Sequence, residues 1–395
     1  MRYLDQVRCA VFFLTIMVVC PVPSIGQTFT VVDTVYTPAN YIGGALSATL
    51  YKPETPKGTA VILLHGILED RSAMTVWGDS LAANGYLAMS IDYPDPIVGG
   101  ATFPAPPRAI KTAVQFLRSN ASKFGISTTR IGSLGISLGA GLVSGAMIDE
   151  EDYAKFGIPS NVDDHLDFAV LFYGLYDYAH FLQTNLSLSY SQYATDYFGK
   201  DQQLQNEETP VLQADKIHCP ILLLHGTGDQ TIQYQQSVEF DDSLRAHGRS
   251  SHLILFPGQT HLFDVGLNGH FSDTGNMAKD SVLLFLEQNV SASVAKNSIA
   301  SNGFSLEQNY PNPFGALSPS GSSQTVIRFE LQHSSYALLR VYNGLGEIVR
   351  MFDFGSLGAG LHTAKIQASA LASGVYYYEL EGGENRVAKS MVVMN

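Results

Sequence analysis

The chain has 395 residues, a formal net charge of −13 and 45% hydrophobic residues. This length suits two domains in addition to a targeting segment, and the apolar content is sufficient for a sizeable core. The acidic balance argues against binding to nucleic acid or to anionic membrane surfaces; it fits an acidic extracellular protein, although solubility alone also explains it.

The first 26 residues have the pattern of a secretory signal peptide. Arg2 and Arg8 form a basic start, and the apolar stretch Ala10–Val19 that follows is too short to cross a membrane. Ser24 and Gly26 are the small residues expected just before a cleavage site. We therefore expect residues 1–26 to be removed and the mature chain to have no membrane span.

Cysteine is scarce in the predicted mature chain. Only Cys219 remains after removal of the signal, so no intramolecular disulfide can form. Cys219 begins an apolar run beside Pro220, which indicates a buried structural thiol. Cys20 offers an alternative as a lipid attachment site, but the bulky Val19 before it disfavours that interpretation.

From residue 45 to residue 290, strand-like and helix-like segments alternate. Short runs of consecutive apolar residues predict strands that are covered on both faces. These runs are Ala60–Leu64, Leu87–Ile91, Ile131–Leu134, Phe168–Phe172, Ile221–Leu224 and His252–Phe256. Helical periods occur at Ala109–Leu117, Ser237–His247 and Met277–Gln288. The alternation predicts an α/β fold with an open sheet and helices on both faces.

Two long stretches interrupt this alternation. Asp149–Asp167 is acidic, and Tyr173–Lys216 is rich in Tyr, Gln, Leu and Asp. Loops of this length in a compact domain are typical of functional lids or of disordered segments. A small cap over a cleft and a solvated insertion are both consistent with Tyr173–Lys216.

The run Gly135–Gly139 fits the pattern G-x-S-x-G, with Ser137 at its centre. A strand-like segment precedes it, and the small-residue helical stretch Leu138–Met147 follows. A serine on such a sharp strand-to-helix turn projects its hydroxyl away from the backbone, and the flanking glycines avoid side-chain collisions. Ser137 is therefore a candidate nucleophile.

Two more candidates follow Ser137 in the chain. Asp229 ends a glycine-rich loop after the strand Ile221–Leu224, and His261 follows the turn after His252–Phe256. The carboxyl ends of parallel strands meet at one edge of a sheet, where sites form. The order serine, aspartate, histidine, each after a predicted strand, is the arrangement needed for acyl transfer.

These segments together resemble the α/β-hydrolase superfamily, and within it the dienelactone-hydrolase-like and esterase branch. The resemblance covers about residues 45–290. It rests on His65-Gly66, Ile91-Asp92-Tyr93-Pro94, the Ser137 turn, Leu171-Phe172-Tyr173-Gly174 and the Asp229 and His261 loops. It implies that Ser137 attacks, His261 transfers the proton and Asp229 orients His261.

The resemblance also implies an oxyanion hole formed by two backbone N–H groups. One belongs to Leu138, directly after the nucleophile, and the other is assigned to Ile67, in the loop after His65-Gly66. The chain departs from many lipases and esterases in lacking the run of glycines that often follows this histidine. No cofactor is implied.

Other residues have competing interpretations. His65 and His225 are expected to be structural, while Asp264, Asp177 and His270 are rivals for the triad positions. Trp77 and Tyr93 are candidate substrate-binding residues, with core packing as an equal alternative. Asp163-Asp164-His165 could suggest a metal, but three adjacent residues are not expected to converge on one ion, so we predict a solvated face and no metal site.

The composition changes after Val290. Residues 291–304 read as a linker, and residues 305–395 alternate with period two, which predicts a small antiparallel β-sandwich. The expected strands are Thr325–Leu331, Ala337–Tyr342, His362–Gln367, Gly374–Leu380 and Ser390–Met394.

The start of this region, Leu306 to Phe314 with Tyr-Pro-Asn-Pro-Phe, resembles the type IX secretion C-terminal sorting domain of Bacteroidota and their relatives. Further matches are Val341–Gly346, Gly374–Tyr378 and the ending Lys389–Met394. The resemblance implies partnership with the type IX secretion machinery and passage through the periplasm to the cell surface or medium. A sandwich that binds carbohydrate or protein is the alternative.

Taken together, these features predict a secreted serine carboxylic-ester hydrolase in residues 27–290. It would act through an acyl-enzyme intermediate on extracellular esters, such as acyl or feruloyl esters of polysaccharides, or polyesters. A serine peptidase of the same fold is the alternative enzyme. A surface binding protein on a hydrolase scaffold is the alternative without catalysis.

Overall fold

The computed structural model describes residues 26–37, 41, 44–95, 100–148, 162–178, 197–266 and 268–295, and residues 304–395 with short gaps. The expected signal peptide lies outside these residues. So does the middle of the Tyr173–Lys216 stretch, residues 179–196, whereas residues 173–178 and 197–216 are described.

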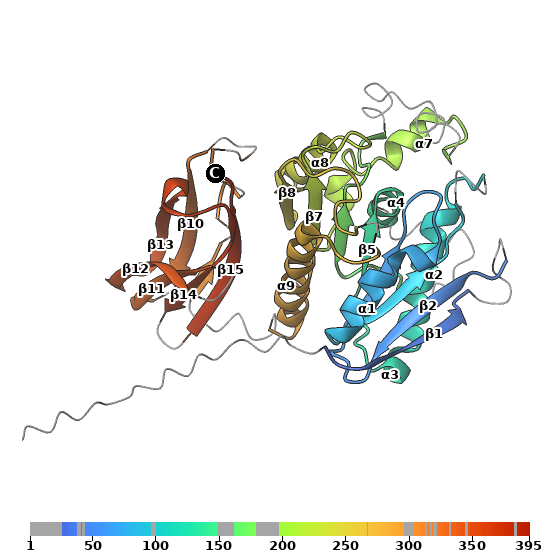
Figure 1. The fold of residues 1–395 in the computed structure, drawn as a ribbon, viewed down its shortest axis with the longest axis horizontal. Helices are drawn as coiled ribbons and strands as arrows, with labels where there is room; N and C mark the ends of the chain where they lie inside the picture. The colour runs from blue at the N-terminus through green and yellow to red at the C-terminus, as the bar shows by residue number, and fades with distance from the viewer. Residues whose placement is uncertain are drawn as a thin grey trace, which may run out of the picture.

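An eight-stranded sheet forms the centre of the N-terminal domain, in the order β1-β2-β4-β3-β5-β6-β7-β8 (Figure 1). The strands β3 to β8 pair in parallel, whereas β1 and β2 pair antiparallel with each other and β2 pairs antiparallel with β4. The strands are β1 Phe29–Val35, β2 Ser47–Pro53, β3 Ala60–Leu64, β4 Leu87–Ile91, β5 Ile131–Ile136, β6 Ala169–Phe172, β7 Ile221–Gly226 and β8 Ser251–Phe256. The carboxyl ends of β5, β7 and β8 therefore share one edge.

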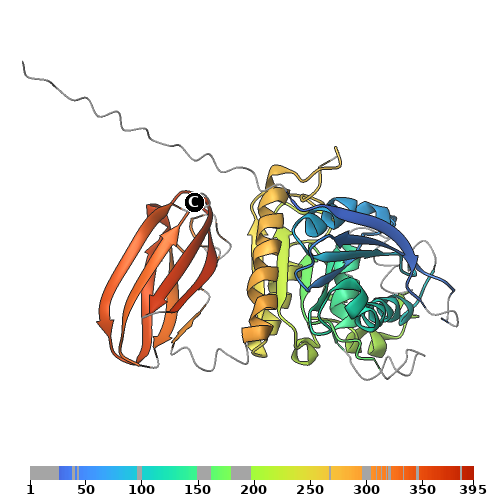
Figure 2. The ribbon, with the colours of Figure 1, turned by 90° about the horizontal axis from the view of Figure 1, so that it is seen from below.

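Helices cover both faces of this sheet. Alternate residues of β3 enter two different cores: Ile62 and Leu64 belong to one, and Val61 and Leu63 to the other. The first core is completed by α2 (Ala105–Ser119), α4 (Leu138–Ala146) and α8 (Gln235–Ala246), and the second by α1 (Thr75–Ala83) and α9 (Asp273–Ala295). Figure 2 shows α9 running lengthwise beside the sheet. Shorter helical segments are η1 Arg71–Met74, α3 Ala121–Phe124, α7 Gln202–Glu207 and η3 Ala214–Lys216.

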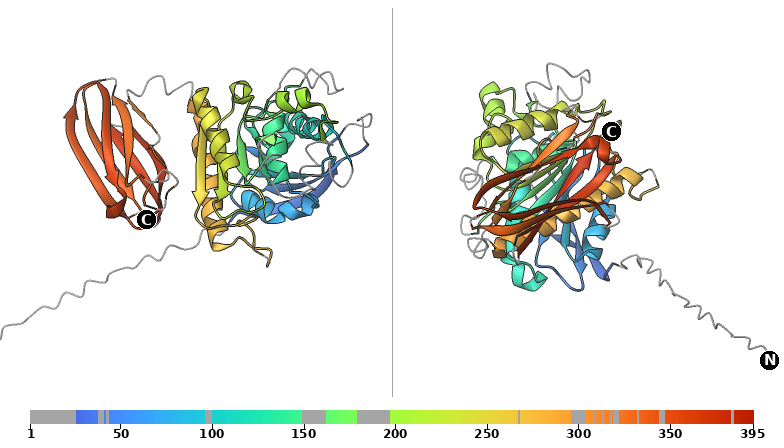
Figure 3. Two further views of the ribbon diagram at one scale, coloured as in Figure 1. Left: turned by 90° about the horizontal axis from the view of Figure 1, so that it is seen from above. Right: turned by 90° about the vertical axis from the view of Figure 1, so that its left-hand side faces the viewer.

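The C-terminal region is made of two antiparallel sheets (Figure 3). One has the order β13-β10-β9 and the other β12-β11-β14-β15. Their apolar faces share one core, which takes Phe329 from β10 and Leu339 from β11. The strands are β9 Phe304–Leu306, β10 Gln324–Leu331, β11 Ser335–Tyr342, β12 Ile348–Leu357, β13 Gly360–Gln367, β14 Gly374–Gly382 and β15 Asn385–Val393, with η5 at Ala368–Ala370. The predicted sandwich is confirmed.

The α/β architecture is confirmed as well, with differences at its ends. The sheet is mixed, because β1 and β2 add an antiparallel edge that the apolar runs did not predict. Helix α9 continues to Ala295, five residues into the expected linker, and β9 begins at Phe304. Within the described part of the chain, no helix combines the length and the hydropathy required to span a membrane.

Candidate active site

Ser137 lies at the junction of β5 and α4, on the sharp turn expected from the sequence. Its backbone has φ 50° and ψ −116°, a strained conformation for a residue other than glycine. The turn is held by a hydrogen bond from the Ser137 amide to the carbonyl of Phe172, at 3.0 Å. The side chain is buried, with 3% of the residue exposed.

The glycines on either side of this turn are required by close backbone contacts. A Cβ atom at Gly135 would lie 2.6 Å from the carbonyl carbon of Gly139. A Cβ atom at Gly139 would lie 2.5 Å from the carbonyl oxygen of His65. Both distances are too short for a real side chain, so glycine allows the turn to pack against the loop after β3.

The Ser137 hydroxyl is hydrogen bonded to a histidine from another loop. Oγ of Ser137 lies 2.9 Å from Nε2 of His261, which follows β8. The Nδ1 atom of His261 lies 2.6 Å from Oδ2 of Asp229, in the loop after β7. Because an ionised carboxylate only accepts, Nδ1 carries the proton and Nε2 is left to accept the serine proton. The three residues expected to form a triad are thus brought together.

Asp229 is surrounded by donors. Its Oδ1 accepts the backbone N–H groups of Thr231 and Ile232, at 2.8 and 2.9 Å. Burial acts to raise the pKa of this carboxyl, but hydrogen bonds from His225 and His261 outweigh burial and lower the pKa below its usual range. Asp229 is therefore ionised at neutral pH and able to stabilise a charged imidazole.

His225 belongs to the same network, whereas its sequence context had predicted only a structural role. Its Nε2 faces two acceptors, the carbonyl of Ile232 at 2.9 Å and Oδ2 of Asp229 at 3.2 Å, so this nitrogen carries the proton. Its Nδ1 then accepts from the Ser237 hydroxyl, at 2.7 Å. The signal was present in the spacing: His225 and Asp229 flank one glycine-rich turn four residues apart.

The loop after β3 contains the predicted second oxyanion donor, Ile67. The amide of Gly66 is already used, because it donates to Oε2 of Glu69 at 2.8 Å. The next residue after Ile67, Leu68, has a positive φ of 61° and is 72% exposed. The loop passes beside Ser137: a Cβ atom added at Gly66 would lie 3.6 Å from the Cβ atom of Ser137.

Trp77 and Tyr93, for which substrate contact and core packing were equal alternatives, are both buried. Trp77 is 1% exposed, packs against Phe172 and Phe271, and donates its indole N–H to Asp264 at 2.8 Å. Tyr93 is 5% exposed and donates its hydroxyl to the carbonyl of His65 at 2.8 Å. Both rings therefore have packing roles: Trp77 fills the core, and Tyr93 supports the loop after β3, where its ring stacks on His65 at 4.4 Å.

The rivals for the triad positions lie elsewhere. Asp264 is 2% exposed and accepts from Trp77 and from the hydroxyl of Tyr173. Hydrogen bonding to His261 is made by Asp229 and not by Asp264. The backbone N–H of Asp177 donates to Gln236, and His270 is exposed on a loop. Of the candidate acids, Asp229 is the one that is hydrogen bonded to His261.

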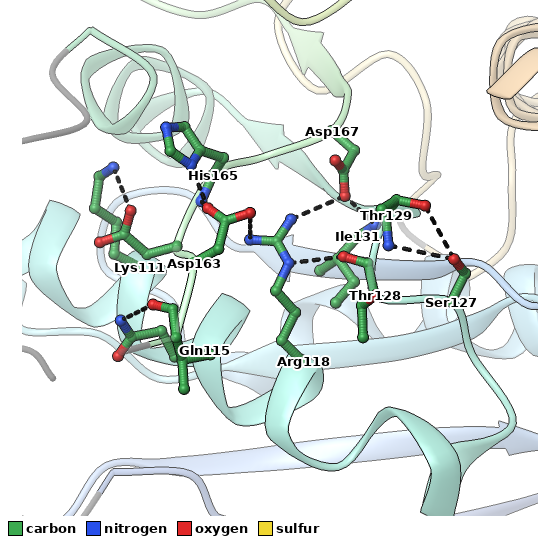
Figure 4. Close-up of polar contacts among 12 residues, drawn as sticks. Lys111, Gln115, Arg118, Ser127, Thr128, Thr129, Ile131, Asp163, His165 and Asp167 are labelled. Carbon is green, nitrogen blue, oxygen red and sulfur yellow. Dashed lines mark hydrogen bonds and ion pairs between the residues drawn. The ribbon is translucent and has the colours of Figure 1, made fainter. Parts of the chain in front are cut away.

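Figure 4 shows the acidic segment before β6, where the sequence raised the question of a metal. One ligand atom from each of Asp163, Asp164 and His165 lies within 4.8 Å of the others, so the expectation that adjacent residues would not converge was wrong. The carboxylates already have cationic partners on α2. Asp164 pairs with Lys111 at 3.3 Å and Asp163 with Arg118 at 3.1 Å. These ion pairs neutralise the charge that would attract a cation.

Comparison with known families decides what this domain is. Residues 50–244 match the BD-FAE family. These residues are similar to the BD-FAE esterase domains, which have the α/β-hydrolase fold. Residues 308–394 match the secretion system C-terminal sorting domain, so the resemblance inferred from the Tyr-Pro-Asn-Pro-Phe segment is also confirmed.

Curated relatives support the esterase assignment of this BD-FAE domain. Esterase LipC of Mycobacterium tuberculosis is 30% identical over 219 residues, which is 53% of this chain and 52% of the relative. The isoprenylcysteine alpha-carbonyl methylesterase ICME of Arabidopsis thaliana is 26% identical over 168 residues, 38% of this chain and 37% of the relative. The chain thus spans about half or less of these relatives.

Solved structures share the fold of the BD-FAE domain. An esterase of Thermogutta terrifontis superposes with a TM-score of 0.51 at 18% identity, covering 70% of this chain and 96% of that one. Esterase B of Lactobacillus rhamnosis gives a TM-score of 0.57 at 18% identity, covering 69% and 90%. A truncated carbohydrate esterase from gut microbiota gives 0.54 at 22% identity, covering 68% and 99%.

Proposed function

We propose that this protein is a secreted serine carboxylic-ester hydrolase with the triad Ser137, His261 and Asp229. The observation that carries the proposal is the continuous pair of hydrogen bonds from Ser137 Oγ to His261 Nε2 at 2.9 Å and from His261 Nδ1 to Asp229 Oδ2 at 2.6 Å. A nucleophile, a base and an orienting acid in this geometry are the parts required for acyl transfer.

The reaction follows from the proton positions. His261 Nε2 takes the hydroxyl proton while Ser137 Oγ bonds to the ester carbonyl carbon, and Asp229 stabilises the imidazolium that results. Collapse of the tetrahedral intermediate breaks the bond to the alcohol, which leaves with the proton from His261. Water then attacks the acyl-enzyme with His261 again as base, and releases the acid. No cofactor takes part in these steps.

We assign the oxyanion hole to the backbone N–H groups of Leu138 and Ile67. Leu138 is the first residue of α4, so its N–H lies at the positive end of that helix and beside the nucleophile. Ile67 follows Gly66, whose own N–H is occupied by Glu69. Loss of one oxyanion donor typically lowers kcat by about 10² to 10³.

The substrate is expected to be an extracellular ester. The sorting domain supports export: residues 305–395 would direct the chain from the periplasm across the outer membrane by the type IX secretion machinery, to the cell surface or the medium. An exported esterase meets acyl or feruloyl esters of polysaccharides, or polyesters. The fold shared with a carbohydrate esterase from gut microbiota is compatible with the polysaccharide class.

The decisive experiment is ester turnover by the purified mature protein, with Ser137→Ala as the matched inactive variant. We expect hydrolysis of short p-nitrophenyl esters by the wild type and none above background by Ser137→Ala. Retained turnover in Ser137→Ala would contradict the assignment of the nucleophile. A panel of acetylated and feruloylated polysaccharides and an insoluble polyester then identifies the substrate class.

A further inference from the structure

The ring of Tyr173 packs against the proposed catalytic histidine. The two ring centroids of Tyr173 and His261 are 4.7 Å apart, with an angle of 59° between the planes. Tyr173 is fully buried and follows the last residue of β6. Its ring therefore contacts the imidazole whose Nδ1 is hydrogen bonded to Asp229.

Tyr173 is itself held in an uncommon conformation. Its backbone has a φ of 38°, in the left-handed region that bulky residues rarely adopt. The Tyr173 amide donates to the carbonyl of Leu224 at 2.8 Å, and its hydroxyl donates to Oδ1 of Asp264 at 2.6 Å. Two hydrogen bonds thus offset the backbone strain and fix the ring.

Asp264 lies in the same loop as His261, three residues further along the chain. It is 2% exposed, and its two side-chain hydrogen-bond donors, Tyr173 and Trp77, are both neutral. A buried carboxylate held by neutral donors is costly compared with an apolar side chain of the same size. Through these two hydrogen bonds, Asp264 links the His261 loop to Tyr173, at the end of β6, and to Trp77, in α1.

We propose, on the basis of the ester hydrolase mechanism above, that Tyr173 is a positioning residue for His261 and that Asp264 holds Tyr173 in place. Asp229 fixes the Nδ1 side of the imidazole, and the Tyr173 ring limits its rotation about the bond to Cβ. Nε2 then stays directed at Ser137 through the cycle of proton uptake and release.

The hydroxyl of Tyr173 is protonated at neutral pH and can therefore act as a donor. Burial, followed by the neighbouring Asp264 carboxylate, raises the pKa of Tyr173 well above its ordinary value. Burial thereby favours the protonated hydroxyl that donates to Asp264.

The test compares Tyr173→Leu, which removes the ring, with Tyr173→Phe, which keeps the ring and removes the hydroxyl. We expect kcat to fall about 10- to 100-fold in Tyr173→Leu with little change in KM, since small misplacements of a catalytic group cost this much. Tyr173→Phe should recover most of this loss. Asp264→Leu, which removes both acceptor oxygens, should resemble Tyr173→Phe, and the double variant should have a kcat no lower than that of the more impaired single variant, because both substitutions remove the same bond.

Tyr176→Leu is the matched control. Tyr176 is a fully buried tyrosine of the same segment, but its ring stacks on Phe240 at 4.8 Å and not on His261. We expect Tyr176→Leu to lower the unfolding temperature as Tyr173→Leu does, without the fall in kcat. If the two leucine variants lose kcat equally, the Tyr173 ring has no special role and the proposal is wrong.

A second readout does not depend on turnover. The Nδ1 proton of His261 should give a distinct low-field NMR signal in the wild type and in Tyr176→Leu, and a broadened or missing signal in Tyr173→Leu. An unchanged signal in Tyr173→Leu would overturn the proposal. A wild-type protein that hydrolyses no ester but shows this difference would refute the proposed function and leave the positioning role standing.

Discussion

In the esterase domain, the buried imidazole of His225 donates to the carboxylate of Asp229, at 3.2 Å. The oxygen that receives it is the one that also accepts from His261. One carboxylate is thus shared by two histidines, and only the second of them reaches the serine.

We predict that His225→Phe lowers kcat by roughly tenfold and lowers the unfolding temperature, because Asp229 loses a donor that helps to fix its orientation. Steady-state kinetics and thermal unfolding measure the two effects. Ser237→Ala, which removes only the partner of His225 Nδ1, should have a smaller effect on kcat. An equal loss of kcat in both variants would show that the contact of His225 with Asp229 is unimportant.

Two buried carboxylates, Asp229 and Asp264, lie near His261 and allow a direct comparison. Asp229→Asn should lower kcat by about 10⁴, as the removal of the orienting charge does in other serine hydrolases. Asp264→Asn should lower it by less than about 100-fold, because its effect passes through Tyr173. Side-by-side kinetics at one pH decide between them; the reverse ranking would make Asp264 the triad acid.

The lowered pKa of Asp229 predicts how stability depends on pH. A carboxyl group whose pKa is lower in the folded state contributes stability above its unfolded pKa, about 3.9, and loses this contribution as the pH falls through the folded value. The difference in unfolding free energy between wild type and Asp229→Asn should therefore shrink as the pH falls below about 5. Chemical denaturation at several pH values tests this, and a difference that grew on acidification would contradict it.

Glu69 is expected to shape the oxyanion loop through its bond to the Gly66 amide. Glu69→Ala should lower kcat about tenfold with little effect on KM, since the loop that carries Ile67 loses its anchor. Glu69→Gln keeps a carbonyl oxygen that can accept from Gly66, so this variant should retain most of the activity. If alanine and glutamine are equally active, the bond does not contribute to catalysis.

Leu68 and Leu262 are exposed residues with positive φ, at 61° and 58°. Asparagine tolerates this conformation better than leucine does. Leu262→Asn should therefore raise the unfolding temperature by about 2 °C. Leu212→Asn is the control, because Leu212 is also exposed but its φ is not positive. Equal shifts in both variants would rule out relief of backbone strain.

Much of the fold was predictable, because parallel strands buried on both faces appear as unbroken apolar runs. The bounds of β3 and β4 were predicted to the residue. The strand β1 was not predicted, since its four central residues are exposed and show no alternation. Chain order and the expected strand ends pointed to Ser137, Asp229 and His261, the three residues that the fold brings together.

The supporting residues of the site could not be found in this way. For Trp77, the sequence left substrate contact and core packing as equal alternatives, because its burial depends on Phe271 and Asp264, which lie almost 200 residues further along the chain. The contact between Tyr173 and His261 likewise joins the end of β6 to the loop after β8. Such pairs are set by packing between distant segments, and a single sequence carries no periodic signal for them.

The order of strands in the sheet also governs when the proposed triad can assemble. Ser137 follows β5, but its base lies 124 residues later, after β8, which pairs within this sheet only with β7. When such a chain leaves a membrane with its amino end first, Ser137 emerges long before His261. The proposed triad is therefore incomplete until β8, the last strand of the sheet in chain order, has docked on β7.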